Sequence, residues 1–257
     1  MRAKHHNMIV EDKSKEIGAK IIYKPSVDST NNYAANLGSQ GKSEHGTVIM
    51  SEEQTNGRGQ RGNKWQSPAR ENLYSSFILE PNSLSVSEQS CLTEMISLAL
   101  VDTLAKYGVN GTIKWPNDIL VNDKKIAGVL IENSNQGMEI NKTIIGVGLN
   151  VAQNEGLPPK ATSILLESGQ KLDPIEVLNE LIRQVAPYWE AVKGRHFKGL
   201  KSKYLLNLYG HKKSRFYKIN EELKEGEIQG VDEYGRLQVC IDGTVQTFDL
   251  KEIQFVY

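Results

Sequence analysis

The strand-rich stretch that follows Gly108 restricts the fold of this chain more than any other segment. Short apolar strands are predicted at 112–115, 119–121, 126–132 and 143–151, with a polar turn at 122–124 between two of them. The helix predicted before them, Val86–Tyr107, has apolar residues at intervals of three and four, and Ser85 and Glu88 form a capping box at its start. This order favours a long helix that leads into a sheet built partly from hairpins.

The other elements predicted before residue 210 add to this sheet and its helices. Strands are predicted at 21–23, 47–51 and 72–79, and a helix follows the capping residues 28–30. Asp173 and Pro174 begin a second strong helix, because an N-cap side chain followed by proline is typical of a helix start. We expect Pro187 to kink or end that helix. A further helical segment is predicted over 194–208, and 153–169 is predicted to be a loop around a short helical turn.

After His211 the pattern changes to short alternating strands. They are predicted at 215–219, 227–231, 236–241 and 245–250, with Gly- or Asp-rich turns between them. About 45 residues of this kind indicate a small β-barrel. We therefore expect an N-terminal tail over 1–19, a main domain over 20–210 and a small barrel domain over 211–257.

Composition excludes several classes of protein. The 257 residues carry 31 basic and 31 acidic side chains, so the chain lacks the basic excess of a protein that binds a nucleic-acid backbone, although a local basic patch remains compatible. Its apolar runs are too short to span a bilayer, and its first residues lack the apolar core of a signal peptide. Cys91 and Cys240 have no metal-type spacing and suit a reducing compartment. We expect a cytoplasmic globular protein.

The sharpest motif is the glycine-rich run from Gly57 to Gly62. It matches G-x-G-x-x-G and follows a predicted strand, as a dinucleotide-binding turn does. In that turn the last glycine opens a helix, whereas here Asn63-Lys64-Trp65 follows without a helical pattern. Its three cations, Arg58, Arg61 and Lys64, suit a mobile loop that wraps a polyanion. An exposed basic turn without a ligand is the alternative.

Three further segments carry polar or small residues inside predicted strands. Lys114-Trp115-Pro116-Asn117-Asp118 ends in hard oxygen ligands that suit Mg²⁺ with phosphates, although Pro-Asn-Asp is also ordinary turn chemistry. In 124–132, Ala127 and Gly128 allow close approach of a ligand, and one of the two lysines before them can point the same way. The run 146–150 has the same ambiguity, with glycines in a buried strand and then Asn150.

In this order the segments resemble the biotin–protein ligase family, also called biotin–[acetyl-CoA-carboxylase] ligase. The residues that carry the resemblance are DSTNNYA (28–34), EEQTNGRGQRGNKWQSP (52–68), KWPNDILVNDKKIAGVLIE (114–132) and GVGLN (146–150). The resemblance implies an α+β fold, with a mixed sheet flanked by helices as in class II aminoacyl-tRNA synthetases, and a C-terminal SH3-like barrel. It also implies the form without an N-terminal DNA-binding domain, and therefore no repressor role.

The resemblance also assigns individual residues. It implies that biotin is bound by Ser29, Thr30, Gln54, Gly57, Arg58, Lys125 and Gly128, the first three at the ureido end. It implies that the nucleotide is bound by Arg58, Arg61, Lys64, Trp65, Lys114, Asn117 and Asn150. The implied catalytic residues are Arg58, Lys114, Asp118 and Lys125, with Asp118 also a Mg²⁺ ligand. Where the family commonly has basic residues, this chain has Gln60 and Asn63, which leaves open how tightly biotinyl-adenylate is held.

The implied reaction has two steps. Biotin attacks the α-phosphate of ATP with Mg²⁺ present, and a lysine of a biotin carboxyl carrier domain then displaces AMP from biotinyl-AMP. A lipoate– or octanoate–protein ligase is the nearest alternative, but the polar set Ser29, Thr30 and Gln54 suits a ureido ring better than an alkyl chain. A non-catalytic sensor of biotin or its adenylate is the alternative from another class. A homodimer through an exposed sheet edge is compatible with the sequence.

Overall fold

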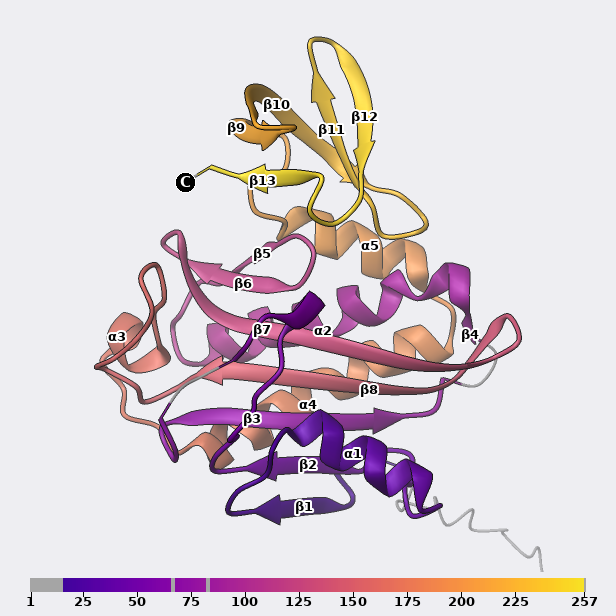
Figure 1. Ribbon diagram of the computed structural model, residues 1–257, viewed down its shortest axis with the longest axis vertical. Coiled ribbons are helices and arrows are strands. Elements are labelled where there is room, and N and C mark those ends of the chain that lie inside the picture. The colour runs from indigo at the N-terminus through magenta and orange to yellow at the C-terminus, as the bar shows by residue number, and fades with distance from the viewer. Residues whose placement is uncertain (1–15, 66–67, 82–83, 257) are drawn as a thin grey trace, which may run out of the picture.

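The computed structural model describes residues 16–65, 68–81 and 84–256, and for Arg61 it describes the backbone alone. Of the predicted N-terminal tail, residues 1–15 lie outside the described part. Two sheets make up the described fold, a large mixed sheet flanked by helices and a smaller antiparallel sheet at the C-terminal end (Figure 1). This arrangement confirms the predicted α+β class.

The large sheet has its longest strands at the centre. Its strands, in spatial order, are β1 (Ile21–Lys24), β2 (Val48–Ser51), β3 (Asn72–Leu79), β8 (Glu139–Asn150), β7 (Lys124–Gln136), β6 (Asp118–Val121) and β5 (Thr112–Lys114). The short strand β4 (Leu84–Ser85) pairs with the far end of β8. Only β1 and β2 pair in parallel, so the sheet is mixed.

The two faces of the sheet pack against different helices. On one face α1 (Thr30–Ser39) covers Ile49, Ile78 and Ile144, which alternate with the residues of the other face. The larger core on the opposite face is formed with α2 (Ser90–Lys106), α4 (Pro174–Lys193) and α5 (Phe197–Leu206). The short helix α3 (Ile164–Ser168) lies in the predicted loop after β8, and the single-turn 3₁₀ helices η2 (Gln60–Gly62) and η3 (Val86–Glu88) precede β3 and α2.

Some predicted boundaries were wrong. Helix α4 does not end at Pro187 but continues to Lys193, because its apolar face stays buried on both sides of the proline, with Val185 and Trp189 in the core. The predicted helix over 86–107 starts with the 3₁₀ turn η3, where the Glu88 carboxylate accepts a hydrogen bond from the Ser85 N–H at 3.0 Å. Strands β7 and β8 extend well beyond the predicted 126–132 and 143–151 into the polar hairpin between them.

The C-terminal sheet has the antiparallel order β12-β11-β10-β9-β13, consistent with a small SH3-like barrel. Its strands are β9 (Ser214–Ile219), β10 (Glu222–Val231), β11 (Leu237–Ile241), β12 (Thr244–Phe248) and β13 (Ile253–Phe255), of which β13 was not predicted. The indole N–H of Trp115 donates to the carbonyl of Gly235 at 2.8 Å and ties this sheet to the main one. The domain boundary at 210/211 stays a prediction.

Within the described ranges, the search for a helix both long and apolar enough to cross a bilayer finds none.

Candidate active site

Glycines form the floor of a small cavity on the face of the sheet that carries α1. Gly128 of β7 pairs directly with Gly148 of β8, and Gly146 lies two residues along the same strand. The cavity has a volume of about 50 Å³ and is also lined by Thr30, Gln54, Arg58, Trp65 and Lys125. We call it the central cavity. Side chains at the glycine positions would fill this cavity. The missing side chain of Gly128 leaves space there, in agreement with the prediction that Gly128 allows close approach of a ligand.

The indole of Trp65 lies against this floor. A Cβ added to Gly148 would lie 2.6 Å from the indole Cε2, and one added to Gly128 would lie 3.0 Å from its Cζ3. Trp65 is held there because the glycine-rich loop folds back on itself, with the Trp65 N–H donating to the Gly57 carbonyl at 3.0 Å. The loop contains the single turn η2 rather than the start of a longer helix. This agrees with the prediction that Asn63-Lys64-Trp65 follows the glycines without a helix.

Neutral polar groups gather at one end of the central cavity, where α1 begins. The Thr30 N–H donates to Oε1 of Gln54 at 2.9 Å, and the Thr30 hydroxyl donates to the same oxygen at 3.2 Å. Behind them the hydroxyl of Ser76 lies 2.8 Å from Thr30 Oγ1 and 2.6 Å from Asn31 Oδ1. Ser29, Thr30 and Ser76 are buried, so this network is shielded from water. It offers hydrogen bonds to a small polar, uncharged group.

Cationic groups gather at the other end of the cavity. Lys125 Nζ lies 2.6 Å from Asp118 Oδ1, and Lys114 Nζ lies 3.9 Å from Oδ2 of the same carboxylate. Lys125 Nζ also lies 5.3 Å from the centre of the Trp65 ring, on its face. Of the two adjacent lysines, Lys125 is therefore the one that faces the cavity, while Lys124 is exposed. This end suits an anionic group.

Arg58 reaches the same cavity from the loop. Its guanidinium donates to the Glu132 carboxylate on β7 and to the side-chain oxygen of Asn32 on α1. Asn32 in turn donates to Asp28, and this hydrogen bond is the main cause of the lowered pKa of the Asp28 carboxyl, to which Arg58 also contributes. The loop, β7 and α1 are thus joined through one arginine.

A second, open depression of about 510 Å³ lies beside the lysine end of the central cavity. We call it the basic groove. Its lining includes the lysines Lys64, Lys114, Lys125, Lys160 and Lys251. Asp118 is the one carboxylate among the described residues that line it. Such an excess of positive charge suits a polyphosphate.

The two predicted asparagines have structural partners. Asn117 lines both the central cavity and the basic groove, and its amide donates to the Val129 carbonyl on β7. Asn150 is buried and donates from Nδ2 to the Thr162 carbonyl at 2.8 Å, which holds the segment before α3 against the end of β8. The predicted nucleotide role of Asn150 stays a prediction.

A family model for biotin/lipoate A/B protein ligases matches residues 23–150, which contain the central cavity and the glycine-rich loop. Residues 23–150 therefore form a domain of the biotin/lipoate A/B protein ligase family. The bifunctional ligase/repressor BirA of Bacillus spizizenii is 33% identical over 66% of this chain and 54% of its own length. BirA of Escherichia coli is 33% identical over 65% of this chain and 53% of its own length. The chain thus spans about half the length of these curated relatives.

Solved structures of the ligase family match most of the chain. A biotin protein ligase from Aquifex aeolicus in complex with biotin and ATP superposes with a TM-score of 0.76 and 27% sequence identity, over 91% of this chain and 97% of that one. The biotin–[acetyl-CoA-carboxylase] ligase of Paracoccus denitrificans is 34% identical over 56% of this chain and 62% of its own length. These matches confirm the predicted family and fold.

The ligase domain brings together most of the predicted site residues. Around the central cavity and the basic groove lie Ser29, Thr30, Gln54, Arg58, Lys64, Trp65, Lys114, Asn117, Asp118, Lys125 and Gly128. Gly57 begins the loop, and a Cβ added there would approach the Trp65 carbonyl to 2.3 Å. The side chain of Arg61 is outside the described part of the chain.

Sequence reasoning missed the residues that support the site from behind, namely Asn31, Ser76 and Glu132. Asn31 donates to a Glu132 carboxylate oxygen at 2.8 Å, so Glu132 connects the polar end of the cavity to Arg58. The alternation of side chains along β7 could have found Glu132, because it lies four residues after Gly128 and therefore on the same face.

The donor set suits Mg²⁺ only in part. Within the described ranges no group of three or more His, Cys, Asp or Glu residues could hold a metal ion by itself. Asp118 offers one carboxylate, and its oxygens already contact two lysines. Mg²⁺ in nucleotide enzymes takes one or two carboxylates, with phosphate oxygens and water as the other ligands. Asp118 therefore fits a magnesium ion that arrives with a nucleotide.

Proposed function

We propose that this protein is an ATP-dependent biotin–protein ligase. It would convert biotin and ATP into biotinyl-AMP and pyrophosphate, and then transfer the biotinyl group to a lysine of a biotin carboxyl carrier domain. The 27% identity and 97% coverage of the Aquifex aeolicus ligase solved with biotin and ATP support this assignment, as do the relatives named biotin–[acetyl-CoA-carboxylase] ligase.

The observation that carries the proposal is the polarity of the central cavity. Thr30 and Gln54 form a neutral hydrogen-bonding end, Lys125 forms a cationic end, and glycines lie between them. Biotin has the matching order, with a neutral ureido group at one end and a carboxylate at the other. The apolar tail of lipoate or octanoate would form no hydrogen bond with the polar groups around Thr30, whereas a ureido group can.

The first step requires groups that hold two anions together. The biotin carboxylate attacks the α-phosphorus, and the bond to the bridging oxygen of pyrophosphate breaks. Lys125 and Arg58 would hold the carboxylate against the phosphate, and Lys114 and Lys64 of the basic groove would stabilise the departing pyrophosphate. Mg²⁺ held by Asp118 and the phosphates would neutralise part of their charge.

The second step requires a proton acceptor. The acceptor lysine attacks the carbonyl of biotinyl-AMP as a neutral amine, AMP leaves, and the amine gives up a proton. Asp118 is the carboxylate beside the lysine end of the cavity, and we assign this proton to it. The loop with Trp65 would cover the adenylate and exclude water, which limits its hydrolysis.

The proposal includes the partners and the setting. The acceptor is a carrier domain of a biotin-dependent carboxylase, and DNA is not a partner, as the balanced charge of the chain suggests. Strand β1 is at the edge of the large sheet, with Ile21 and Tyr23 each 43% exposed, and a homodimer through this edge is part of the proposal. Free Cys91 and Cys240 suit the cytoplasm.

The test is to mix the protein with Mg-ATP and, in separate reactions, biotin, lipoate and octanoate. Pyrophosphate release and acyl-adenylate are then followed by mass spectrometry. We expect adenylate from biotin alone. A lipoyl or octanoyl adenylate instead would assign the chain to the sister ligases of the same family. Biotin binding without any adenylate would contradict the ligase and favour the non-catalytic sensor.

A further inference from the structure

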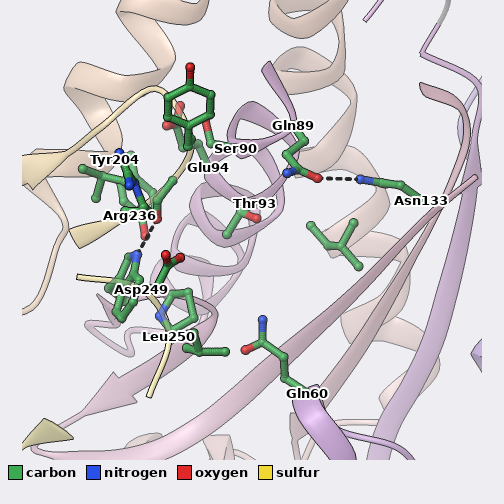
Figure 2. Close-up of a pocket in the computed structure, with 16 residues that line it drawn as sticks. Gln60, Gln89, Ser90, Thr93, Glu94, Asn133, Tyr204, Arg236, Asp249 and Leu250 are labelled. Atoms are coloured by element: carbon green, nitrogen blue, oxygen red, sulfur yellow. Dashed lines mark hydrogen bonds between the residues drawn. The ribbon is translucent and has the colours of Figure 1, made fainter. Parts of the chain in front are cut away.

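A third cavity lies between the ligase domain and the C-terminal sheet. It has a volume of about 330 Å³ and lies between the start of α2, the edge of β7 and the turn between β10 and β11 (Figure 2). We call it the interdomain cavity. Glu94 and Thr93 of α2, Tyr204 of α5 and Arg236 after β10 are among its lining residues. The ligase chemistry proposed above assigns no role to it.

Glu94 brings a carboxylate into this cavity from the second turn of α2. The residue is 4% exposed, and within the described part of the chain its carboxylate has neither a hydrogen bond nor an ion pair. Burial removes water from the carboxylate and raises the pKa of Glu94 to about 7, against which the charge of Lys201 acts only in part. Burying a carboxylate without a partner costs free energy. A ligand that donates a hydrogen bond to Glu94 would therefore be stabilised here.

Asn133 of β7 also lines this cavity. The side-chain oxygen of Asn133 is buried and has no hydrogen-bond partner among the described residues, while its Nδ2 donates to Gln89 at 3.3 Å (Figure 2). Trp115, Tyr204 and Tyr234 add aromatic side chains to the lining. An unpaired carboxylate beside aromatic rings matches an alkyl chain that ends in a cationic donor.

The positive charge already present is committed elsewhere. The guanidinium of Arg236 donates to the Asp232 carboxylate at 2.8 Å, and the backbone N–H of Arg236 donates to the same carboxylate at 2.9 Å. Lys201 donates to the carbonyl of Asp232 at 3.2 Å. Asp249, on the opposite side of the cavity from α2, adds a second carboxylate to the lining. Among the described charged residues that line the cavity, the carboxylates Glu94 and Asp249 therefore outnumber the one cation, Arg236, which is already paired with Asp232.

We propose that the interdomain cavity is a binding site for an alkylammonium group, whose nitrogen donates to the Glu94 carboxylate. A chain the length of a lysine side chain fits within the 330 Å³. The group comes either from a free amine or from a lysine of a protein partner. The site is separate from the central cavity, and its ligand binding does not depend on the proposed ligase activity.

The experiment is a titration of the ¹⁵N-labelled full-length protein with n-butylammonium chloride at pH 8 and constant ionic strength, without biotin or ATP. We expect saturable shifts of the backbone amide resonances of Thr93, Glu94 and Gly235, with a Kd on the order of 1 mM for so small a ligand. 1-Butanol has the same chain without the charge and should bind at least tenfold more weakly. Equal binding of the two, or no saturable shift with butylammonium, would overturn the proposal.

Variants separate the role of the carboxylate from general charge. Glu94→Gln keeps the shape of the side chain and should weaken butylammonium binding at least tenfold, whereas Glu94→Asp keeps the charge and should bind more tightly than the glutamine variant. Glu190→Gln removes the same charge from an exposed site on α4 and should bind as the wild type does. Binding to Glu94→Gln within twofold of the wild type would contradict the assignment.

The two sources of the amine are distinguished with a matched pair of capped amino acids. Nα-Acetyl-lysine methylamide carries the ammonium on a peptide backbone, and the norleucine counterpart lacks it. Binding of the lysine compound at least as tight as that of butylammonium, with none of the norleucine compound, identifies a protein side chain as the ligand. Binding of butylammonium alone identifies a free amine.

Discussion

The indole of Trp65 lies so close to the backbone of Gly148 that a methyl group on that glycine would come within 2.6 Å of the indole Cε2. Gly148 belongs to the central strand β8, whose backbone is fixed by pairing on both sides. The side chain in the loop must therefore give way if a larger residue replaces Gly148. The position of the loop depends directly on the absence of a Cβ in the sheet.

Gly148→Ala should move Trp65 away from β8 and prevent the loop from closing. We expect at least a tenfold lower rate of biotinyl-AMP formation, measured by pyrophosphate release. Gly199→Ala is the matched control, because a Cβ at Gly199 in α5 meets no atom within 4 Å, and it should keep the wild-type rate. A Gly148→Ala enzyme that forms adenylate at the wild-type rate would show that Trp65 need not rest on the sheet.

Two adjacent lysines differ in their surroundings, which gives a direct test of the cationic end. Lys125 contacts Asp118 at 2.6 Å and lines the central cavity, whereas Lys124 is exposed at the tip of the hairpin. Lys125→Gln should lower kcat/KM for adenylate formation at least 100-fold, because it removes the charge proposed to hold the biotin carboxylate against the phosphate. Lys124→Gln should stay within twofold of the wild type. Equal effects of the two would contradict the predicted role of Lys125.

Neighbouring serines of β3 provide the corresponding test for the polar end. Ser76 lies within 2.8 Å of Thr30 Oγ1 on the α1 face, whereas the hydroxyl of Ser75 is buried on the opposite face without a described partner. Ser76→Ala should raise KM for biotin about tenfold, since a lost buried hydrogen bond costs about 1–2 kcal/mol, and leave kcat within threefold. Ser75→Ala should leave both constants unchanged. Steady-state kinetics with biotin as the varied substrate measure KM and kcat for both variants and test these expectations.

Stability should depend on pH through Glu94. Its pKa is about 7 in the folded protein against 4.5 ordinarily, because it is buried. Between these values the folded protein keeps a proton that the unfolded chain loses, so the contribution of Glu94 to the unfolding free energy is complete below pH 4.5 and falls as the pH rises through 7. The loss is about 3 kcal/mol. The wild type loses this contribution as the pH rises, whereas Glu94→Gln does not. The unfolding free energy of Glu94→Gln relative to that of the wild type should therefore rise by about 2–3 kcal/mol between pH 5 and pH 8.

Urea unfolding at the two pH values measures this difference. The charged and titratable groups around Glu94 are Glu88 and Cys91 near the start of α2, Lys201 and Tyr204 on α5, and Asp232, Tyr234, Arg236 and Asp249 of the C-terminal sheet. Glu94→Gln removes only one of them, so a pH dependence that survives in the variant comes from the others. If the difference in unfolding free energy between Glu94→Gln and the wild type were the same at pH 5 and pH 8, this would contradict the buried, unpaired state of Glu94.

Much of the fold was predictable because its elements carry strong local signals. The helix α2 has a regular apolar pattern and ends within one residue of the predicted end, and the capping box predicted for its start caps the 3₁₀ turn η3 just before it. The hairpin over 132–142 has no such pattern, since its residues are mostly polar and exposed. It forms because β7 and β8 continue to pair beyond the core, and long-range pairing leaves no local signature.

The residues of the candidate site also fall into a group that the sequence could predict and a group that only the structure shows. Residues that would contact a ligand lie in motifs such as Gly57–Gly62 and could be found in the sequence. Ser76 and Asn31 act from behind Thr30, through hydrogen bonds between α1 and β3. The partner of Arg58 was equally hidden, since Glu132 is 74 residues away in the chain. A sequence shows which groups are present, but the contacts between distant segments depend on strand register.

Gln60 lines the central cavity, the basic groove and the interdomain cavity together. A ligand that fixes its side chain in one of them therefore changes the shape of the other two. Thermodynamic linkage makes any such effect reciprocal: the factor by which an amine in the interdomain cavity changes the affinity for biotin equals the factor by which biotin changes the affinity for the amine. If ligands bind in these cavities as proposed, Gln60 is one uncharged side chain that all three of them would share.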